Sequence, residues 1–166
     1  MEDKFILDVC CGGRQFWFNK AHPNTVYIDI RIAEKGHNWH RPNHEVKPNI
    51  VMDFRKLEFE DERFKLIIFD PPHIFHASDK SIIEKQYGAL NKETWQEDIK
   101  QGFDECWRVL EPLGIIIFKW NEARVKKTEV LKVIGREPLF GHHTKSNHKS
   151  HWLCFMKIPI KIGGSK

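Results

Sequence analysis

Short runs of apolar and β-branched residues recur along this chain, and the first four of them each lead into an aspartate. These runs lie at residues 4–9, 25–28, 49–52 and 64–69, and the aspartates are Asp8, Asp29, Asp53 and Asp70. A fifth run occupies residues 114–120. Buried strands separated by longer connections are typical of a parallel α/β sheet. Because the carboxyl ends of parallel strands share one edge, where open sheets bind ligands, we expect the four aspartates to lie near one site.

The segment that follows the fourth run contains the clearest helical pattern. Apolar residues repeat at helical spacing over residues 94–110. Thr94 and Glu97 fit a capping box at its start. Pro112 and Gly114 are expected to end this helix.

The remaining connections divide into regular and irregular segments. A second helix is predicted at 124–134. Residues 152–158 alternate as a final strand, which we expect to pair with residues 138–140. The connections 31–48 and 73–91 are long and largely irregular, the second with a short weak helix, so they are candidate functional loops at the carboxyl edge.

Length and composition limit the classes of protein that this chain can be. Its 166 residues, 40% of them hydrophobic and 30% charged, predict one domain over residues 1–160 and a short flexible tail at 161–166. The acidic start and the short apolar runs argue against a signal peptide and against a membrane span. Four cysteines without a C-x-x-C pair predict reduced thiols, so we expect a cytoplasmic protein. The net charge of +4 and six tryptophans favour a phosphate-bearing partner without requiring one.

The sequence Asp70-Pro71-Pro72-His73 directly after the fourth run carries the strongest chemical signal. An exocyclic amino group on a nucleobase is a poor nucleophile because its lone pair is delocalised into the ring. A carboxylate and a backbone carbonyl that accept both of its N–H groups localise this lone pair and aim it at a methyl donor. Two prolines stiffen the turn and remove backbone donors that would compete for that carbonyl. A flat side chain at the fourth position can stack on the substrate ring.

This tetrapeptide resembles the (Asp/Asn)-Pro-Pro-aromatic motif of the amino methyltransferases, which methylate adenine N6 or cytosine N4. His73 stands where the motif usually has Tyr, Phe or Trp, and it adds a titratable ring to the site. The resemblance implies that Asp70, Pro71, Pro72 and His73 are catalytic and that His73 also contacts the substrate.

The turn after the first run adds a second resemblance. Its residues are similar to the Asp-x-x-Cys-Gly-x-Gly cofactor loop of the same enzymes, except that Arg14 replaces the second glycine. The turn lacks Gly-x-Gly-x-x-Gly, which makes nicotinamide or flavin binding less favoured. The resemblance implies binding of S-adenosyl-L-methionine (SAM), with S-adenosyl-L-homocysteine (SAH) as product. The implied cofactor residues are Asp8, Cys10, Cys11, Gly12, Gly13, Asp29 for the ribose, Asp53 and Phe54 for the adenine, and Asp70.

The resemblance covers about residues 4–120 and implies the Rossmann-like class I methyltransferase fold. We therefore expect a seven-stranded sheet in the order 3-2-1-4-5-7-6 with strand 7 antiparallel. The implied activity is methylation of a planar amino nitrogen, with adenine N6 of DNA as the first candidate. RNA, a small molecule and a protein amide remain alternative substrates. A different class of function, an inactive SAM-binding subunit that binds nucleic acid, also remains open, and a homodimer could supply further substrate surface.

Two further features concern the substrate, and a third concerns metal binding. Lys119 and Trp120 end the fifth run at the same edge, and we expect both to bind the substrate. Residues 119–149 hold eight Lys or Arg against three Glu, which suits a phosphate backbone or a solvated helix face. The histidines between 142 and 151 match no common zinc spacing, so no metal site is predicted.

Overall fold

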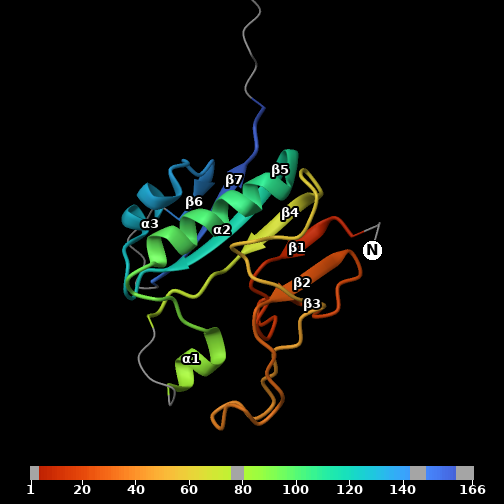
Figure 1. Cartoon of the computed structure of the whole chain (residues 1–166), viewed down its shortest axis with the longest axis vertical. Helices are drawn as coiled ribbons and strands as arrows, with labels where there is room; N and C mark the ends of the chain where they lie inside the picture. Colours follow the sequence, from red (N-terminus) through yellow and green to blue (C-terminus); the bar gives the residue numbers. More distant parts are fainter. Residues whose placement is uncertain (1–3, 76–80, 143–148, 160–166) are drawn as a thin grey trace, which may run out of the picture.

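The computed structural model describes residues 4–75, 81–142 and 149–159, and within them the chain forms one seven-stranded sheet (Figure 1). The order is β3-β2-β1-β4-β5-β7-β6. Neighbouring strands are parallel except that β7 runs antiparallel to β5 and β6. The predicted α/β class, strand order and antiparallel strand 7 are therefore confirmed. The strands are β1 (Ile6–Asp8), β2 (Thr25–Asp29), β3 (Ile50–Val51), β4 (Phe64–Phe69), β5 (Leu110–Asn121), β6 (Phe140–Gly141) and β7 (Ser150–Met156).

The two central strands β1 and β4 are short apolar runs for a physical reason. Leu7 of β1 pairs with Val26 on one side and Ile67 on the other, and all three side chains are buried. Strands that are covered on both faces have continuous runs of apolar residues, without alternation between apolar and polar residues. The ends of these strands bring Asp8 and Asp70 to the same edge of the sheet.

Helix α2 (Trp95–Val109) confirms the predicted helix to within one residue at each end, but the interaction at its start differs from the prediction. The Thr94 hydroxyl donates to the Asp98 carboxylate at 3.0 Å and makes no side-chain cap bond, so the predicted capping box is wrong. The chain passes from the helix into β5 at Leu110, two residues before Pro112. Pro112 lies in an irregular start of β5, where the pairing with β4 shifts register. The helix therefore passes directly into the strand, with Pro112 two residues beyond its C-cap Leu110.

The other two helices are shorter than the sequence patterns. Helix α3 (Lys127–Ile134) starts three residues later than predicted, and Gly135 ends it in the left-handed conformation at φ 70°. Helix α1 (Ile82–Tyr87) lies in the long connection after β4, with the Ser81 side chain accepting from the Glu84 N–H. Figure 1 shows α1 beyond the carboxyl end of the sheet. The segment 161–166 and the histidines 143 and 148 lie outside the described residues.

The two faces of the sheet are covered by different kinds of structure. Helices α2 and α3 cover one face, where Phe103 and Val130 join Phe118 and Phe155 in the main core. Residues 9–24 and 30–49 are all described and contain no helix, so loops make both crossovers between β1, β2 and β3. This agrees with the predicted irregularity of the second connection. These loops form the floor of the cavities described next.

Candidate active site

A cavity of about 210 Å³ lies at the carboxyl ends of β1, β4 and β5, and we call it the turn cavity. It brings together most of the residues predicted for methyl transfer with part of the predicted cofactor loop. Its lining includes Cys10, Cys11, Gly12, Gly13, Gln15, Phe16, Arg31, Asp70, Pro71, Pro72, His73, Gln86, Tyr87 and Lys119. Two segments separated by about sixty residues of sequence thus form one site.

Asp70 and Lys119 form an ion pair in the turn cavity. The Lys119 Nζ atom lies 2.5 Å from the Asp70 Oδ2 atom, and the two side chains are 22% and 16% exposed. Burial raises the pKa of Asp70, and the charge and hydrogen bond of Lys119 oppose that rise. The Lys119 ammonium also lies 5.7 Å from the ring centres of both Phe16 and Trp152. The lysine is therefore held beside the carboxylate by two aromatic faces.

His73 is a neutral ring in the wall of the turn cavity. Burial, together with the positive charge of Lys119, lowers the pKa of His73 to about 4. Its ring centre lies 6.2 Å from that of Tyr87, with an angle of 44° between the planes. A neutral imidazole can stack on a substrate ring or exchange one hydrogen bond, but it carries no charge near pH 7.

The loop after β1 contains the residues that resemble the cofactor-loop motif. Gly12 has φ 45°, and its N–H donates to the Asp29 carboxylate at 2.9 Å. A Cβ atom at Gly13 would lie 2.6 Å from the His44 ring, so a larger residue does not fit there. Arg14 has φ 51° and so keeps the left-handed backbone that a glycine would adopt. The departure from the cofactor-loop pattern therefore leaves the backbone conformation in place.

A second cavity, of about 330 Å³, adjoins the turn cavity at the ends of β2 and β3, and we call it the acidic cavity. Asp29, Asp53 and Phe54 line it, as predicted for a cofactor pocket. The Phe54 ring packs against Phe69 at 5.5 Å and covers Gly102 of α2, where a Cβ atom would clash with it. The two cavities share the residues Cys10, Arg31, Pro72 and Tyr87.

Two arginines that the sequence analysis did not consider bind the aspartates of the acidic cavity. The Arg31 backbone N–H and Nε both donate to Asp29 Oδ1, and its Nη2 donates to Asp29 Oδ2, at 2.9 to 3.1 Å. With the Gly12 N–H, these bonds use the four acceptor positions of the carboxylate. Arg55 binds Asp53 in the same way. The signal was present in the sequence, because Asp-x-Arg occurs after both strands.

Two buried donors in the turn cavity also escaped the sequence analysis. Arg31 Nη1 and Gln86 Nε2 are buried, and neither has a hydrogen-bond partner in the part of the chain that the structure describes. Gln86 lies on α1, whose following Gly88 lies against Arg31 and Pro72. Only the folded position of α1 brings Gln86 to this cavity, so spacing in the sequence gave no hint of it.

Asp8 and Trp120 are not brought to either cavity. Asp8 is fully buried, its Oδ2 accepts from the Trp17 indole N–H at 2.7 Å, and burial raises its pKa to about 7. Trp120 is 1% exposed, lies in the main core and donates to the Val125 carbonyl, which corrects its predicted role in substrate binding. Successive residues of a strand point to opposite faces, so with Lys119 at the cavity Trp120 points to the helix-covered face.

The thiols beside the site are not ionised nucleophiles. Burial raises the pKa of Cys10, and burial with the nearby Asp8 and Asp29 charges raises the pKa of Cys11 to about 12. Across residues 4–75, 81–142 and 149–159, no group of three His, Cys, Asp or Glu side chains could hold a metal ion. None of the helices in these ranges is long and apolar enough to cross a membrane.

The fold is shared with solved structures of known class. A SAM-dependent methyltransferase from Methanosarcina mazei superposes with a TM-score of 0.54 at 13% identity, over 95% of this chain and 94% of that chain. The N-methyltransferase NodS from Bradyrhizobium japonicum superposes with a TM-score of 0.56 at 13% identity, over 94% and 86%. This chain has the methyltransferase fold. The PH0226 protein from Pyrococcus horikoshii is also similar, with a TM-score of 0.58 at 20% identity, over 92% and 81%. No protein-family model and no curated protein matches the sequence.

The site of this chain is built largely from loops. The acidic and turn cavities lie at the edge that the resemblance predicted for cofactor and substrate. Loops form the crossovers on the β1–β3 side, and the short helix α1 lies against the turn. The chemistry of the site must therefore be argued from its own residues.

Proposed function

We propose that the protein is a SAM-dependent N-methyltransferase that acts on the planar amino nitrogen of a nucleobase, with adenine N6 of DNA as the first substrate to test. The observation that carries this proposal is the meeting of the Asp70-Pro71-Pro72-His73 turn with the Gly12 loop in one cavity. The methyltransferase fold and the order of these two segments along the chain support it.

The two cavities fit the cofactor in size and in chemistry. A drug-sized ligand occupies roughly 300–1,000 Å³, and the acidic and turn cavities are contiguous through four shared residues. We assign Asp29 to the ribose, whose hydroxyl would replace a hydrogen bond from Arg31, and Phe54 and Asp53 to the adenine. When bound, the cofactor supplies an electrophilic methyl group on a sulfonium. The Gly12 loop lies against the turn cavity, where the amino-acid end of the cofactor would be held.

The residues of the turn orient the nucleophile. The Asp70 carboxylate accepts one N–H of the substrate amino group, and a backbone carbonyl of the Pro-Pro turn accepts the other. This localises the lone pair on nitrogen and directs it along the line of attack. Lys119 forms an ion pair with Asp70, and its charge opposes the rise in the pKa of Asp70 that burial causes. The neutral His73 ring stacks on the substrate.

The test is ligand binding followed by methyl transfer. SAH should raise the unfolding temperature, since a ligand at about 100 times its Kd adds roughly 2.7 kcal/mol, whereas NAD should not. Asp29→Asn should weaken the SAH effect. Asp61→Asn, which changes an exposed aspartate near the amino end of β4, is the matched control and should leave it intact.

Radiolabelled methyl transfer then separates the substrate classes. Adenine-containing DNA should accept label, with RNA, small amines and protein amides assayed in parallel. Absence of SAH binding would overturn the methyltransferase proposal. SAH binding without transfer to any of these substrates would favour the alternative of an inactive SAM-binding subunit.

A further inference from the structure

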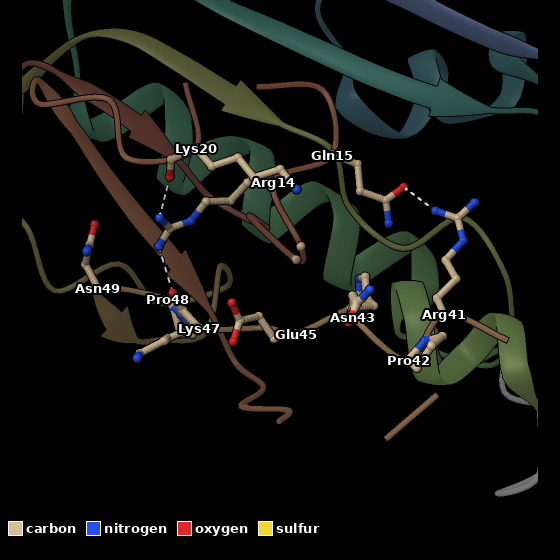
Figure 2. Close-up of a pocket in the computed structure, with 13 residues that line it drawn as sticks. Arg14, Gln15, Lys20, Arg41, Pro42, Asn43, Glu45, Lys47, Pro48 and Asn49 are labelled. Atoms are coloured by element: carbon tan, nitrogen blue, oxygen red, sulfur yellow. Dashed lines mark hydrogen bonds between the residues drawn. The ribbon is translucent and has the colours of Figure 1, made fainter. Parts of the chain in front are cut away.

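A third cavity lies beside the active site and is rich in positive charge. It has a volume of about 580 Å³, and we call it the basic cavity. Four cationic side chains line it, Arg14, Lys20, Arg41 and Lys47, against the single carboxylate of Glu45 (Figure 2). His44 adds no charge, because burial and the surrounding cations lower its pKa. The cavity therefore suits an anionic ligand.

Arg14 builds this cavity by joining two loops. Its guanidinium donates to the Lys20 carbonyl at 2.5 Å and to the Lys47 carbonyl at 2.7 Å, and it lies 3.8 Å from the centre of the Tyr27 ring (Figure 2). The loop before β2 and the loop before β3 are thereby held together. Lys20 and Lys47 flank this clamp in the lining of the cavity, where their side chains add positive charge (Figure 2).

The basic cavity adjoins the turn cavity. Gly12, Gly13 and Gln15 line both of them. Across the boundary, the Arg41 guanidinium donates to the Gln15 side chain at 3.2 Å (Figure 2). An anionic chain bound in the basic cavity would therefore lie next to the turn cavity that contains Asp70.

The same two loops each expose a large aromatic side chain. Phe18 is fully exposed, two residues before Lys20, and Trp39 is 71% exposed, two residues before Arg41. The Trp39 ring is already stacked on His40, with centres 3.6 Å apart and 27° between the planes. Exposed aromatic rings beside a cationic groove are the features by which proteins bind single-stranded nucleic acid, since bases stack on the rings while cations follow the backbone.

We propose that the basic cavity, with Phe18 and Trp39, binds the backbone and flanking bases of a single-stranded nucleic acid whose target base enters the turn cavity. This proposal rests on the proposed function and narrows its substrate class. A single strand exposes its bases without the unstacking cost that a duplex requires, and no base flipping is needed. Of the basic segment 119–149, which the sequence analysis considered for this role, Lys119 lies in the turn cavity, whereas the lysines of α3 line neither the basic cavity nor the turn cavity.

The experiment is fluorescence anisotropy with one labelled adenine-containing oligonucleotide, offered as single-stranded DNA, as RNA and as a DNA duplex. The double variant Lys20→Glu/Lys47→Glu should bind the single strands at least about tenfold more weakly, and its salt slope should fall by about 1.4. Trp39→Ala should lose about tenfold in affinity with an unchanged salt slope, because stacking releases no counterions. Lys126→Glu/Lys132→Glu, with the same change of charge on exposed lysines at α3, should change affinity by less than about twofold.

The outcomes separate this inference from the proposed function, because each variant is also assayed for stabilisation by SAH. Equal losses in the two double variants, or tighter binding of the duplex than of the single strands, would overturn the inference. Stabilisation by SAH without binding of any single strand would overturn it while leaving the methyltransferase proposal in place. Binding that depends on Lys20, Lys47 and Trp39, together with stabilisation by SAH, would support it. The same binding without stabilisation by SAH would overturn the proposed function and, with it, the entry of a target base into the turn cavity.

Discussion

The carboxyl edge of the sheet holds its four aspartates in two different ways. On the β2–β3 side, Asp29 and Asp53 each accept several hydrogen bonds from the arginine two residues later. On the β1–β4 side, burial dominates: it raises the pKa of Asp8 to about 7 and also raises the pKa of Asp70. For Asp53 the hydrogen bonds from Arg55 outweigh the effect of burial, and the pKa is lowered.

This difference divides the edge by chemistry. On the β2–β3 side each carboxylate already accepts several hydrogen bonds from its arginine, so a nucleoside donor has to compete with that arginine. The β1–β4 side is a desolvated region in which a carboxylate interacts strongly with whatever faces it. We infer that the aspartates on the β2–β3 side recognise the ligand, and that the carboxylates on the β1–β4 side interact with charge at the reacting group.

The largest expected effect concerns Asp70. Asp70→Ala removes an acceptor for the substrate amino group and should lower kcat by about 10²–10³-fold, comparable to the loss of one oriented hydrogen-bonding group in other active sites. Asp70→Asn keeps a carbonyl acceptor at the same position and should stay within about tenfold of the parent. Steady-state methyl transfer measures both, and the SAH-induced shift should be unchanged in both. Equal loss in the two variants would show that the charge, and not the acceptor, is what the site needs.

The pH dependence of stability that Asp8 contributes should have the opposite sign to the one that Asp53 contributes. The folded pKa of Asp8 lies above its unfolded value, so its contribution to stability is fully present below about pH 4 and is lost as the pH rises through about 7. Chemical denaturation should therefore show that the parent loses on the order of 2–4 kcal/mol more than Asp8→Asn between about pH 4 and 8. Asp53, with a lowered pKa, should stabilise above its unfolded pKa and lose that effect as the pH falls.

Asp53→Asn is thus the control. Its effect on the pH dependence of stability should have the opposite sign and be smaller, because Asp53 and Arg55 are partly exposed. Identical pH trends in the two variants would contradict the opposite directions of the pKa shifts of Asp8 and Asp53.

The fold and most of the site could be predicted because they depend on local patterns. Apolar runs that end in aspartate define parallel strands, and parallel strands place their ends together. Accordingly, Asp29, Asp53, Phe54, Asp70 and Lys119 all line the predicted edge. Residues whose position depends on tertiary packing were not predictable in this way. Gln86 reaches the turn cavity only through the placement of α1.

Other differences between prediction and structure show where a tertiary contact outweighed a local sequence pattern. The Thr94 hydroxyl binds the Asp98 carboxylate, which is buried and also accepts from Arg55, so a capping box was replaced by an interaction that crosses elements. Arg14 occupies a left-handed position because its side chain clamps two loops, which offsets the strain of that backbone conformation. Neither the contact of Arg55 with Asp98 nor the contacts of Arg14 with the two loops can be inferred from the spacing of these residues in the sequence.

The smallest expected effect tests whether the two Asp-x-Arg pairs are equivalent. Arg55 also binds Asp98 of α2 at 2.9 Å, whereas Arg31 has a buried Nη1 without a partner among the described residues. Arg31 covers all the acceptor positions of Asp29 that Gly12 leaves, so a ribose hydroxyl has to displace it. Arg31→Met should therefore destabilise the ligand-free protein but bind SAH about three- to tenfold more tightly, whereas Arg55→Met should change the affinity by less than about twofold. Isothermal titration calorimetry with SAH measures both affinities. Weaker binding by Arg31→Met would instead show that the free Nη1 of Arg31 holds the ligand, and that Asp29 positions the arginine.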